Sequence, residues 1–395
     1  MSSAADIASG PLARDSADLT PRVAAGRAEW HALSALAALR EDWVDLSRRA
    51  AEPNVFYDPA FALAAAPVFG NPGAMLVWSK SGKLIGLFPA RAERRYGVTA
   101  TLTGWTHAYA PFGVPLIDRD ETEAAIAAFL DQVETSERLP KLIMLPFVAM
   151  NGTFAATLAK VLLRRGGAME VFHSHQRAQL APTGDRRTYL DRALAHKKLK
   201  ELRRQRRRLL DRGQLKTLVA RDPDAIPRAL SDHLALEAAG WKGRRGSAAG
   251  QDAAVRGFIE SALGALARDG NVRIERLMQN NHALATTITL QNGSSAWFWK
   301  VAYDEDFARH SPGVQATLDL TEHLLAEPNV LRVDSCASAG HAMIDHLWRE
   351  RLSLGDLLIA PSRAALAQFR IARHLETLRR ALETTAKAVR NGLLR

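Results

Sequence analysis

The sequence predicts a mixed α/β protein built from two halves of similar plan, because one order of elements occurs twice along the chain. In each pass, strands joined by short turns lead into a helix, a strand, a second helix and a final strand. Strands joined by short turns pair antiparallel, whereas strands separated by helices suit a mixed sheet with helices on its faces. The two halves show no repeat of individual residues, so the duplication is inferred from the order of their elements alone.

The first pass follows a helix expected at 31–46. Its expected elements are strands at 74–79, 84–92 and 99–105, a helix at 121–136, a strand at 141–148, a helix at 153–165 and a strand at 168–180. The turn Ser81-Gly82-Lys83 separates the first two strands.

The second pass opens with a basic helix at 189–212, which ends at Gly213, a residue that commonly terminates helices. The elements expected after it are a strand at 214–220, helices at 225–239 and 252–268, strands at 272–279, 282–290 and 295–303, a helix at 314–326, a strand at 330–335, a helix at 341–350 and a strand at 354–360.

These passes define the expected domains. We expect a flexible tail at 1–28, an N-terminal half at 29–185, a C-terminal half at 186–360 and a basic amphipathic helix at 361–395. In that last helix, an apolar stripe is formed by Leu375, Leu378, Leu382, Val389 and Leu393.

Composition excludes several classes of protein. The chain has 395 residues, of which 47% are hydrophobic and 24% charged, so general disorder is excluded. No stretch approaches the roughly 18 apolar residues of a membrane-spanning helix, and no secretory signal is expected at the N-terminus. The single cysteine, Cys336, rules out a disulfide framework and suits a reducing, cytoplasmic compartment.

The net charge of +11 is concentrated in two segments. Residues 196–212 carry nine Lys and Arg against two acids, and residues 361–395 carry eight against two. Each segment is either a solvated helix face or a contact for a polyanion, such as nucleotide phosphates, transfer RNA or an anionic membrane surface. For 189–212 we expect transfer RNA or an anionic membrane as possible partners, and no DNA partner, because the segment lacks aromatic residues for base stacking.

The segment Arg309-His310-Ser311-Pro312-Gly313-Val314-Gln315-Ala316 links the strand 295–303 to the helix at 314–326. Gly313 allows close approach of a ligand, and the first helical turn offers amide groups and a positive dipole end to an anion. This arrangement resembles the acyl-CoA N-acyltransferase (GNAT) fold, in which such a loop holds the pyrophosphate of the donor. The resemblance implies an acyl-CoA site at Ser311, Pro312, Gly313, Val314 and Gln315. The sequence departs from the superfamily pattern Gln/Arg-x-x-Gly-x-Gly/Ala at its first and last positions, which are His310 and Gln315.

Three further segments, 236–248, 297–313 and 333–340, stand in the order typical of CelD-like acetyltransferases of cellulose biosynthesis, a branch of the GNAT superfamily. The similarity extends over about residues 30–360. It implies an acetyltransferase acting in cellulose or exopolysaccharide biosynthesis. Two GNAT-like halves are also the plan of Fem-type aminoacyltransferases, which use charged transfer RNA.

Acyl transfer from a thioester to an amine needs a neutral amine, a donor to the developing oxyanion and a proton source for the thiolate. Tyr303, near the end of its strand, is the candidate proton donor, and Asp334, at the end of the next strand, is the candidate to orient the acceptor amine. Glu237 is a candidate general base. Each of these residues also has a purely structural alternative.

Trp241, Lys242 and Lys300 are the candidate acceptor-binding residues. Trp241 and Lys242 open a glycine-rich loop that ends at Gly250, where Trp241 is either a core residue or part of a mobile loop over the acceptor. The odd spacing of Lys300 and Tyr303 puts them on opposite strand faces, so only one of them should face the cleft. No metal site is expected, because the histidines lack a third ligand at suitable spacing.

We therefore expect an acyltransferase that moves an acetyl or other acyl group from acyl-CoA directly to an amine or hydroxyl of a sugar or amino-acid derivative. It would work in the cytoplasm, with peripheral contact to the inner membrane face as an option. Only the second half should bind the donor, because Pro111 and Pro115 remove amides at the equivalent place in the first half. The alternatives are a Fem-type aminoacyltransferase and a non-catalytic scaffold at a polysaccharide synthase.

Overall fold

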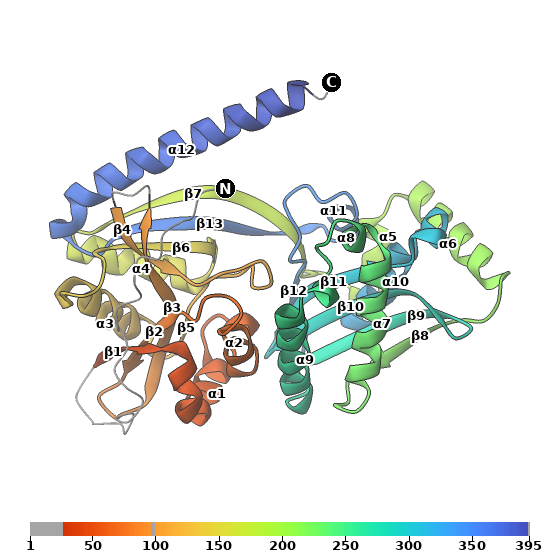
Figure 1. Ribbon diagram of the computed structural model, residues 1–395, viewed down its shortest axis with the longest axis horizontal. Coiled ribbons are helices and arrows are strands. Elements are labelled where there is room, and N and C mark those ends of the chain that lie inside the picture. Colours follow the sequence, from red (N-terminus) through yellow and green to blue (C-terminus); the bar gives the residue numbers. More distant parts are fainter. Residues whose placement is uncertain (1–26, 96–98, 394–395) are drawn as a thin grey trace.

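The computed structural model describes residues 27–95 and 99–393, so the expected tail at 1–28 lies outside the described residues except for its last two positions. Two lobes lie side by side, and a pair of long strands and one long helix run along the upper side of the first lobe (Figure 1).

The first lobe holds the elements of the first pass. In chain order they are β1 (Ala28–Ala32), α1 (Arg40–Arg49), α2 (Pro59–Ala65), β2 (Gly73–Trp78), β3 (Leu84–Arg95), β4 (Thr99–Gly104), β5 (Leu116–Ile117), α3 (Thr122–Thr135), β6 (Leu142–Ala149), α4 (Thr153–Arg165) and β7 (Ala168–Leu180). The start of the helix expected at 31–46 is wrong, because β1 pairs with β2 and a 3₁₀ helix, Leu33–Leu39, precedes α1.

The elements of the second pass form the second lobe, except the last strand. In chain order they are α5 (Tyr189–Ala193), α6 (His196–Leu210), β8 (Leu215–Ala220), α7 (Ile226–Ala239), α8 (Trp241–Arg244), α9 (Ala253–Arg268), β9 (Val272–Gln279), β10 (His282–Asn292), β11 (Ser295–Tyr303), α10 (Pro312–Ala326), β12 (Arg332–Asp334), α11 (Ile344–Leu347) and β13 (Glu350–Ala360). The chain continues as α12 (Leu366–Leu393). No helix in the described part of the chain is long and apolar enough to cross a bilayer.

Two expected helices differ in the structure. The basic helix at 189–212 is divided into α5 and α6, because Ala195 is extended, with φ −61° and ψ 137°. The helix expected at 341–350 shrinks to the four residues of α11. It ends early because β13 begins at Glu350, where it starts to pair with β7, and because the fully buried Trp348 donates its indole N–H to Thr321 Oγ1 at 3.0 Å.

One sheet runs through both lobes, in the strand order β1-β2-β3-β4-β6-β13-β7-β12-β11-β10-β9-β8, with β5 paired to β3. Most neighbours are antiparallel, but β4 with β6 and β11 with β12 are parallel. This mixed sheet with helices on its faces confirms the predicted mixed α/β class. The two parallel pairs occupy the same place in each lobe, immediately before and after the helix that follows the meander.

The last strand of the second pass lies inside the sheet of the first lobe. β13 pairs antiparallel with β6 on one side and with β7 on the other. At its far end β7 pairs with β12, so this ribbon of β7 and β13 crosses from one lobe to the other. The two halves therefore share strands, which the order of elements along the sequence does not indicate.

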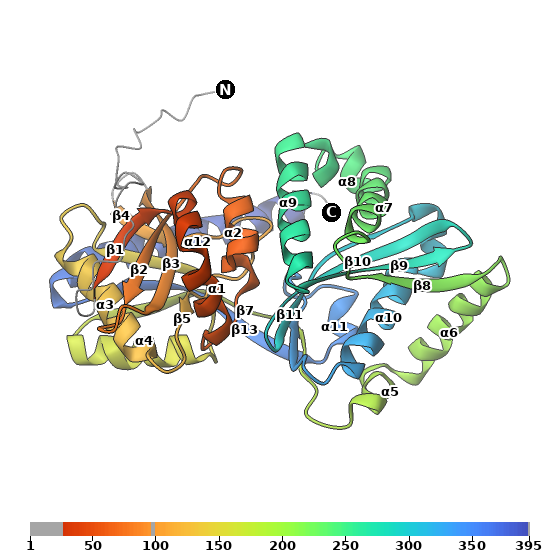
Figure 2. The same cartoon turned by 90° about the horizontal axis from the view of Figure 1, so that it is seen from below.

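Aromatic rings fill the contact between the lobes, where α2 and α9 face each other (Figure 2). The rings of Phe61 and Phe258 meet edge to face at 5.2 Å between centroids, and Phe69 stacks on His107 at 4.0 Å. Burial, followed by the charge of Arg91, lowers the pKa of His107 to about 3. His107 is therefore a neutral part of this apolar contact at pH 7.

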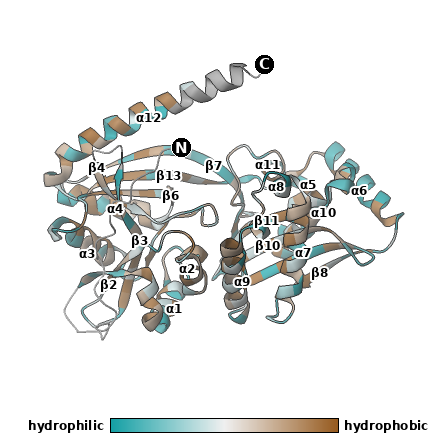
Figure 3. Ribbon diagram, in the orientation of Figure 1, coloured by the Kyte–Doolittle hydropathy of each residue, from teal (hydrophilic) through white to brown (hydrophobic). Residues whose placement is uncertain are grey.

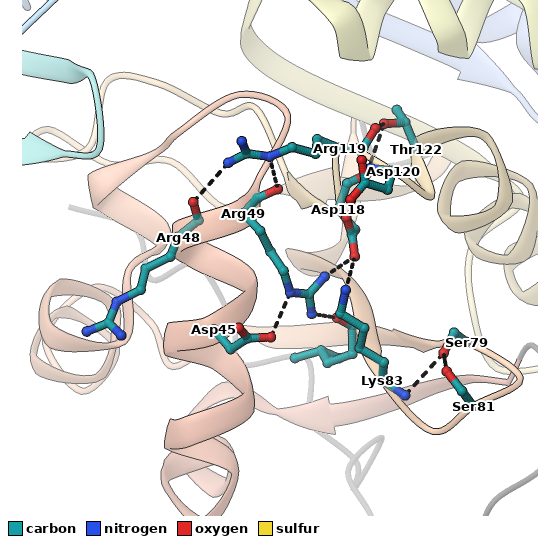
Figure 4. Close-up of polar contacts among 11 residues, drawn as sticks. Asp45, Arg48, Arg49, Ser79, Ser81, Lys83, Asp118, Arg119, Asp120 and Thr122 are labelled. Atoms are coloured by element: carbon teal, nitrogen blue, oxygen red, sulfur yellow. Dashed lines mark hydrogen bonds and ion pairs between the residues drawn. The ribbon is translucent and has the colours of Figure 1, made fainter. Parts of the chain in front are cut away.

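A buried carboxylate, Asp118, joins three elements of the first lobe (Figure 4). Its side chain is fully buried and pairs with Arg49 of α1 and with Lys83 of the β2–β3 turn, the latter at 3.0 Å. It also accepts the N–H of Asp120 at 3.0 Å. Burial alone would raise the pKa of Asp118, but the hydrogen bonds from Asp120 and Lys83 and the charge of Arg49 outweigh it and hold this pKa below its ordinary value.

Replacing this carboxylate should destabilise the protein. Asp118→Asn is expected to lower the free energy of unfolding by about 3 kcal/mol, because Arg49 keeps its charge without its buried partner. Urea unfolding at neutral pH measures the loss. Because the folded pKa lies below the ordinary value of 3.8, the stabilisation is present above that value and disappears as the pH falls through the folded pKa. The difference between wild type and variant should therefore shrink in acid.

Asp45 provides the matched control. It pairs with the same Arg49 at 2.6 Å, but its side chain is 62% exposed. Asp45→Asn should cost well under about 1 kcal/mol, since exposed ion pairs contribute little. Equal losses for the two variants would contradict the role assigned to Asp118.

Candidate active site

A cavity opens where β11 and β12 separate. The two parallel strands pair only from Ser295 opposite Arg332 to Trp297 opposite Asp334, after which β12 ends and β11 continues to Tyr303. The cavity between them has a volume of about 590 Å³. It is lined by side chains and backbone of α8, β11, the start of α10 and the chain after β12: Trp241, Lys242, Phe298, Trp299, Lys300, Val301, Tyr303, Ala308, Ser311, Pro312, Gly313, Val314, Ser335, Cys336, Ala337, His341, Ala342, Met343 and Ile344.

The N-terminus of α10 forms one wall of this cavity. Ser311 has a positive φ of 51°, which turns the chain from the preceding 3₁₀ helix into α10, and Pro312 takes the first helical position, where no N–H is needed. A Cβ atom added to Gly313 would lie 3.1 Å from Cδ1 of Tyr303, so glycine keeps this wall close to the strand. The first-turn amides and the positive end of the helix dipole make the wall suited to an anion.

The structure brings four of the five predicted donor-binding residues, Ser311 to Val314, to the cavity. Gln315 is the exception. Its buried side chain donates to the carbonyl of Leu202 in α6 at 2.9 Å, and its N–H bonds to the carbonyl of Ser311 within the helix. Gln315 therefore fastens α10 to α6 and does not line the cavity.

Lys300 and Tyr303 both line the cavity, so the expectation that only one of them would do so is wrong. The register of β11 against β10 is regular between these two residues, and the bulge of the strand lies before Lys300, beside Trp299. They thus project from opposite faces, as their spacing requires. Both reach the cavity because it opens along the edge of β11 that β12 leaves unpaired.

Lys300 lies against aromatic rings from both lobes. Its Nζ is 4.0 Å from the ring centroid of Tyr109, in the first lobe, and 5.5 Å from that of Trp299. The indole N–H of Trp299 donates to the carbonyl of Tyr109 at 2.8 Å and fixes this loop. Burial, and then the charge of Lys242, lower the pKa of Lys300 to about 8, although Glu237 acts to raise it. Lys300 can therefore exchange a proton near neutral pH.

Glu237 lies next to the cavity but is fully engaged. One carboxylate oxygen accepts from Lys242 Nζ at 2.6 Å and the other from the N–H of Ala249 at 2.8 Å. Burial would raise the pKa of Glu237, but these hydrogen bonds and the charge of Lys242 outweigh it and hold the pKa below its ordinary value. In this arrangement Glu237 is a weak base. It positions Lys242 and the loop that closes on Ala249.

Asp334 is buried and pairs with Arg177 of β7 rather than pointing into the cavity. Its other oxygen accepts the N–H of Cys336 at 3.0 Å. Arg177 also donates to the carbonyl of Pro111 at 3.0 Å, so Asp334 helps to hold the first-lobe loop against β12. Burial, and then the charge of Asp334, raise the pKa of Cys336 well above its ordinary value, which keeps this cavity-lining thiol protonated.

Trp241 is 46% exposed at the mouth of the cavity, with the guanidinium of Arg245 5.1 Å from its ring centroid. It is therefore a surface residue of the site, not a core residue. Among the described residues, no group of three or more His, Cys, Asp or Glu side chains is arranged to hold a metal ion.

Sequence reasoning missed Tyr109, Trp299 and His341 as residues of the site. Tyr109 lies between His107 and Pro111, in a loop rich in aromatic residues that follows β4. The aromatic content of this loop could have indicated a binding role, because aromatic residues with a polar group are enriched at binding surfaces. What the sequence did not show is that this loop of one lobe reaches the strands of the other.

The matching place in the first lobe is closed by its own chain. β4 and β6 are parallel like β11 and β12, but the loop after β4 packs into the gap between them. Gly113 donates its N–H to the carbonyl of Phe147 at 3.1 Å, and a Cβ at Gly113 would lie 2.0 Å from the carbonyl oxygen of Pro146. This contact holds the loop after β4 against the chain of β6.

Comparisons with known proteins agree with this geometry. Residues 196–359 match a family model described as an acetyltransferase (GNAT) domain. The match spans the second lobe from α6 to β13. A search of curated proteins found no significant match.

Three solved structures share the fold. The C-terminal domain of a protein named as a lysylphosphatidylglycerol synthetase of Agrobacterium fabrum superposes with a TM-score of 0.54, 12% identity and coverage of 85% of this chain and 95% of that one. A protein of unknown function from Bacteroides thetaiotaomicron superposes with a TM-score of 0.52 and 12% identity, and the match covers 82% of this chain and 97% of that one. FemX superposes with a TM-score of 0.55 and 11% identity, and the match covers 83% of this chain and 97% of that one. The chain therefore shares the fold of these three structures, and residues 196–359 of its second half match the GNAT domain model.

The low pKa of Lys300 gives a prediction that needs no substrate. In competitive labelling with an amine-reactive reagent, followed by mass spectrometry, the reactivity of Lys300 should rise through a midpoint near pH 8, because burial lowers its pKa from 10.5. Glu237→Gln removes a charge that raises this pKa, so the midpoint should move to lower pH. The exposed Lys160 serves as the internal reference. A Lys300 midpoint near pH 10 would contradict the environment described here.

Proposed function

We propose that the chain is an acyltransferase that binds acetyl-CoA or another acyl-CoA in the cavity between β11 and β12. The acyl group passes directly to an amine, or to a hydroxyl, of a sugar or amino-acid derivative, without a covalent enzyme intermediate. The observation that carries this proposal is the separation of β11 from β12 beside the N-terminus of α10, with Lys300 and Tyr303 on the opposite wall. The GNAT match of the second half supports it.

The residues present fit such a donor. The phosphates would lie at the first-turn amides of Gly313 and Val314, where the helix dipole is positive. The apolar side chains that line the cavity, among them Phe298 and Val301, suit the acyl-bearing arm. The acyl-CoA supplies an activated thioester, and the remaining chemistry belongs to the protein.

Lys300 and Tyr303 would act at the reacting centre. When the acceptor amine attacks the thioester carbon, Lys300 in its ammonium form donates a hydrogen bond to the oxygen that becomes negative. As the carbon–sulfur bond breaks, Tyr303 gives its phenolic proton to the leaving sulfur, and solvent takes the proton released by the amine. Tyr303 is 37% exposed, so its proton can be restored from water.

Other predicted residues would position these two. Glu237 holds Lys242, whose charge lowers the pKa of Lys300, and Asp334 fixes the chain at Cys336. Trp241, exposed at the mouth, offers a face on which a sugar or planar acceptor could stack. The first lobe shapes the acceptor side of the cleft through Tyr109.

A second candidate is transfer from charged transfer RNA, as expected for Fem-type enzymes. The observation in its favour is α6, an amphipathic helix that buries Leu202 and Leu209 and exposes most of its basic side chains. The third candidate, a non-catalytic scaffold, would dock on a polysaccharide synthase at the membrane surface through the basic helices α6 and α12. Only the scaffold candidate makes no use of the cavity.

The similarity of 236–248, 297–313 and 333–340 to CelD-like acetyltransferases supports an acceptor among the glycan precursors of cellulose or exopolysaccharide biosynthesis. We place the reaction in the cytoplasm, where acyl-CoA is made, with peripheral contact at the inner membrane face.

The donor is tested by calorimetry with acetyl-CoA and with charged transfer RNA. Gly313→Val should weaken acetyl-CoA binding more than tenfold, because a branched side chain at this position meets Tyr303 and narrows the donor wall. Replacing Arg203, Arg204, Arg207 and Arg208 by Gln removes four charges from α6 and should affect transfer RNA binding and its salt dependence instead. Acetyl-CoA binding that is unchanged in folded Gly313→Val would refute the donor site. Tight transfer RNA binding that is lost only in the α6 variant would favour the Fem-type candidate.

Catalysis is tested on an identified acceptor. Tyr303→Phe should lower turnover by ~10²-fold or more with acyl-CoA affinity nearly intact, because only the hydroxyl is removed. Lys300→Met should lower turnover by a similar factor and abolish the fall in rate that the wild type shows as the pH rises through about 8, where the ammonium form is lost. Asp334→Asn should lower the free energy of unfolding, because Arg177 loses its buried partner, or raise the KM of the acceptor. Full turnover in both the Tyr303 and the Lys300 variants would exclude this mechanism.

A further inference from the structure

The C-terminal helix α12 is fixed to the sheet by one face. Phe369 and Ala372 are 5% exposed and pack on β6 and β13. Further along the helix, Arg380 pairs with Asp356 of β13 at 3.1 Å and lies 5.2 Å from the ring centroid of Phe172 in β7. These contacts fix the rotation of the helix about its axis and therefore determine which side chains face outward.

The outward face carries a stripe of aliphatic side chains, three of which are largely exposed among the described residues. Ile371 is 54% exposed, Leu378 61% and Leu382 71%, and the half-buried Leu375 lies between them. The spacing of four, three and four residues places them on one side of a helix, opposite Phe369. We call these four residues the α12 stripe. Figure 3 shows hydrophobic and hydrophilic residues alternating along this helix up to its grey part.

Basic side chains flank the α12 stripe. Arg370 is exposed on one side, and Arg379 is half-buried on the other. Arg373 is also exposed but lies nearer the sheet, where it pairs with Glu170 of β7 at 3.8 Å. Glu376, the acid of this region, is buried against the sheet side and contacts Arg379 and Arg380. In the sequence, residues 361–395 carry eight Lys and Arg against two Glu. The exposed surface of α12 is thus apolar along its centre and cationic at its margins.

We propose that α12 binds the surface of a bilayer that contains anionic lipids, with the α12 stripe inserted between headgroups and the arginines at the phosphates. An apolar stripe with basic margins on a helix lying parallel to the surface is the arrangement that such binding requires. A second copy of the chain is the less suitable occupant, because pairing two α12 stripes would bring their arginines together. The proposal does not depend on the acyl transfer proposed above, because α12 packs on the first lobe and contributes nothing to the cavity.

The test is flotation of the full chain with vesicles of phosphatidylcholine alone or with about 30% phosphatidylglycerol. The protein should float only with the anionic vesicles, and raising the salt from about 0.1 to 0.5 M should weaken binding. The variant I371Q/L378Q/L382Q keeps helix propensity and charge but removes the exposed apolar groups, so its vesicle affinity should fall at least about tenfold. Urea unfolding and circular dichroism verify that it is folded.

The matched control carries L163Q/V219Q/L331Q, which replaces three other exposed aliphatic residues, and it should bind vesicles like the wild type. Equal binding by the α12 variant and the wild type would overturn the proposal, as would wild-type protein that does not float. If vesicle binding is lost only when the four arginines of α6 are replaced by Gln, the membrane contact belongs to α6 and the proposal for α12 is overturned. Sedimentation velocity gives the last arm: a dimer that dissociates in I371Q/L378Q/L382Q would show that a second copy covers the stripe.

Discussion

The antiparallel pairing of β7 with β13 holds the whole molecule together. These strands pair from Gln179 opposite Glu350 to Ala168 opposite Ala360, and they run from the second lobe into the first. β13 also pairs with β6, and β7 with β12, so the ribbon belongs to both lobes at once. Because backbone hydrogen bonds buried in a sheet are costly to break, the lobes cannot hinge apart at this point without losing sheet structure.

The position of the candidate site follows from this ribbon. Arg177 lies on β7 where the ribbon enters the second lobe, and it contacts Asp334 of β12 and the carbonyl of Pro111. One side chain thus connects the strand that borders the cavity to the first-lobe loop that delivers Tyr109. The closeness of Tyr109 to Lys300 depends on the geometry of the ribbon as well as on local packing.

Much of the fold was predictable from the sequence, because turn residues and apolar periodicity are local signals. The strands around Ser81-Gly82-Lys83 and the helix after Gly313 fall close to their expected places. The donor wall from Ser311 to Val314 was predictable for the same reason, since one short segment contains it. The role of Gln315 was not, because its partner Leu202 lies more than a hundred residues away.

The errors share one physical cause, which is long-range pairing. β13 begins earlier than its periodicity suggested because β7 pairs with it from Glu350 onward. Asp334 and Glu237 looked available for chemistry because their partners, Arg177 and Ala249, are distant in sequence or part of the backbone. The lowered pKa of Lys300 likewise arises from burial and from the charge of Lys242. Tyr109, which lies against Lys300, comes from the other lobe, and no local pattern of β11 reveals that contact.

The exchange of β13 also sets the order in which the protein can mature during synthesis. The first lobe is made first, yet β6 and β7 each lack a neighbour until residues 350–360 have left the ribosome. Until then, Leu142 and Met144 of β6 have neither Leu358 nor Phe369 to cover them. While the second lobe is translated, the nascent first lobe therefore has unpaired edges on β6 and β7 and an exposed apolar surface. Its sheet cannot be completed before residues 350–360 are made, although its chain is the first to appear.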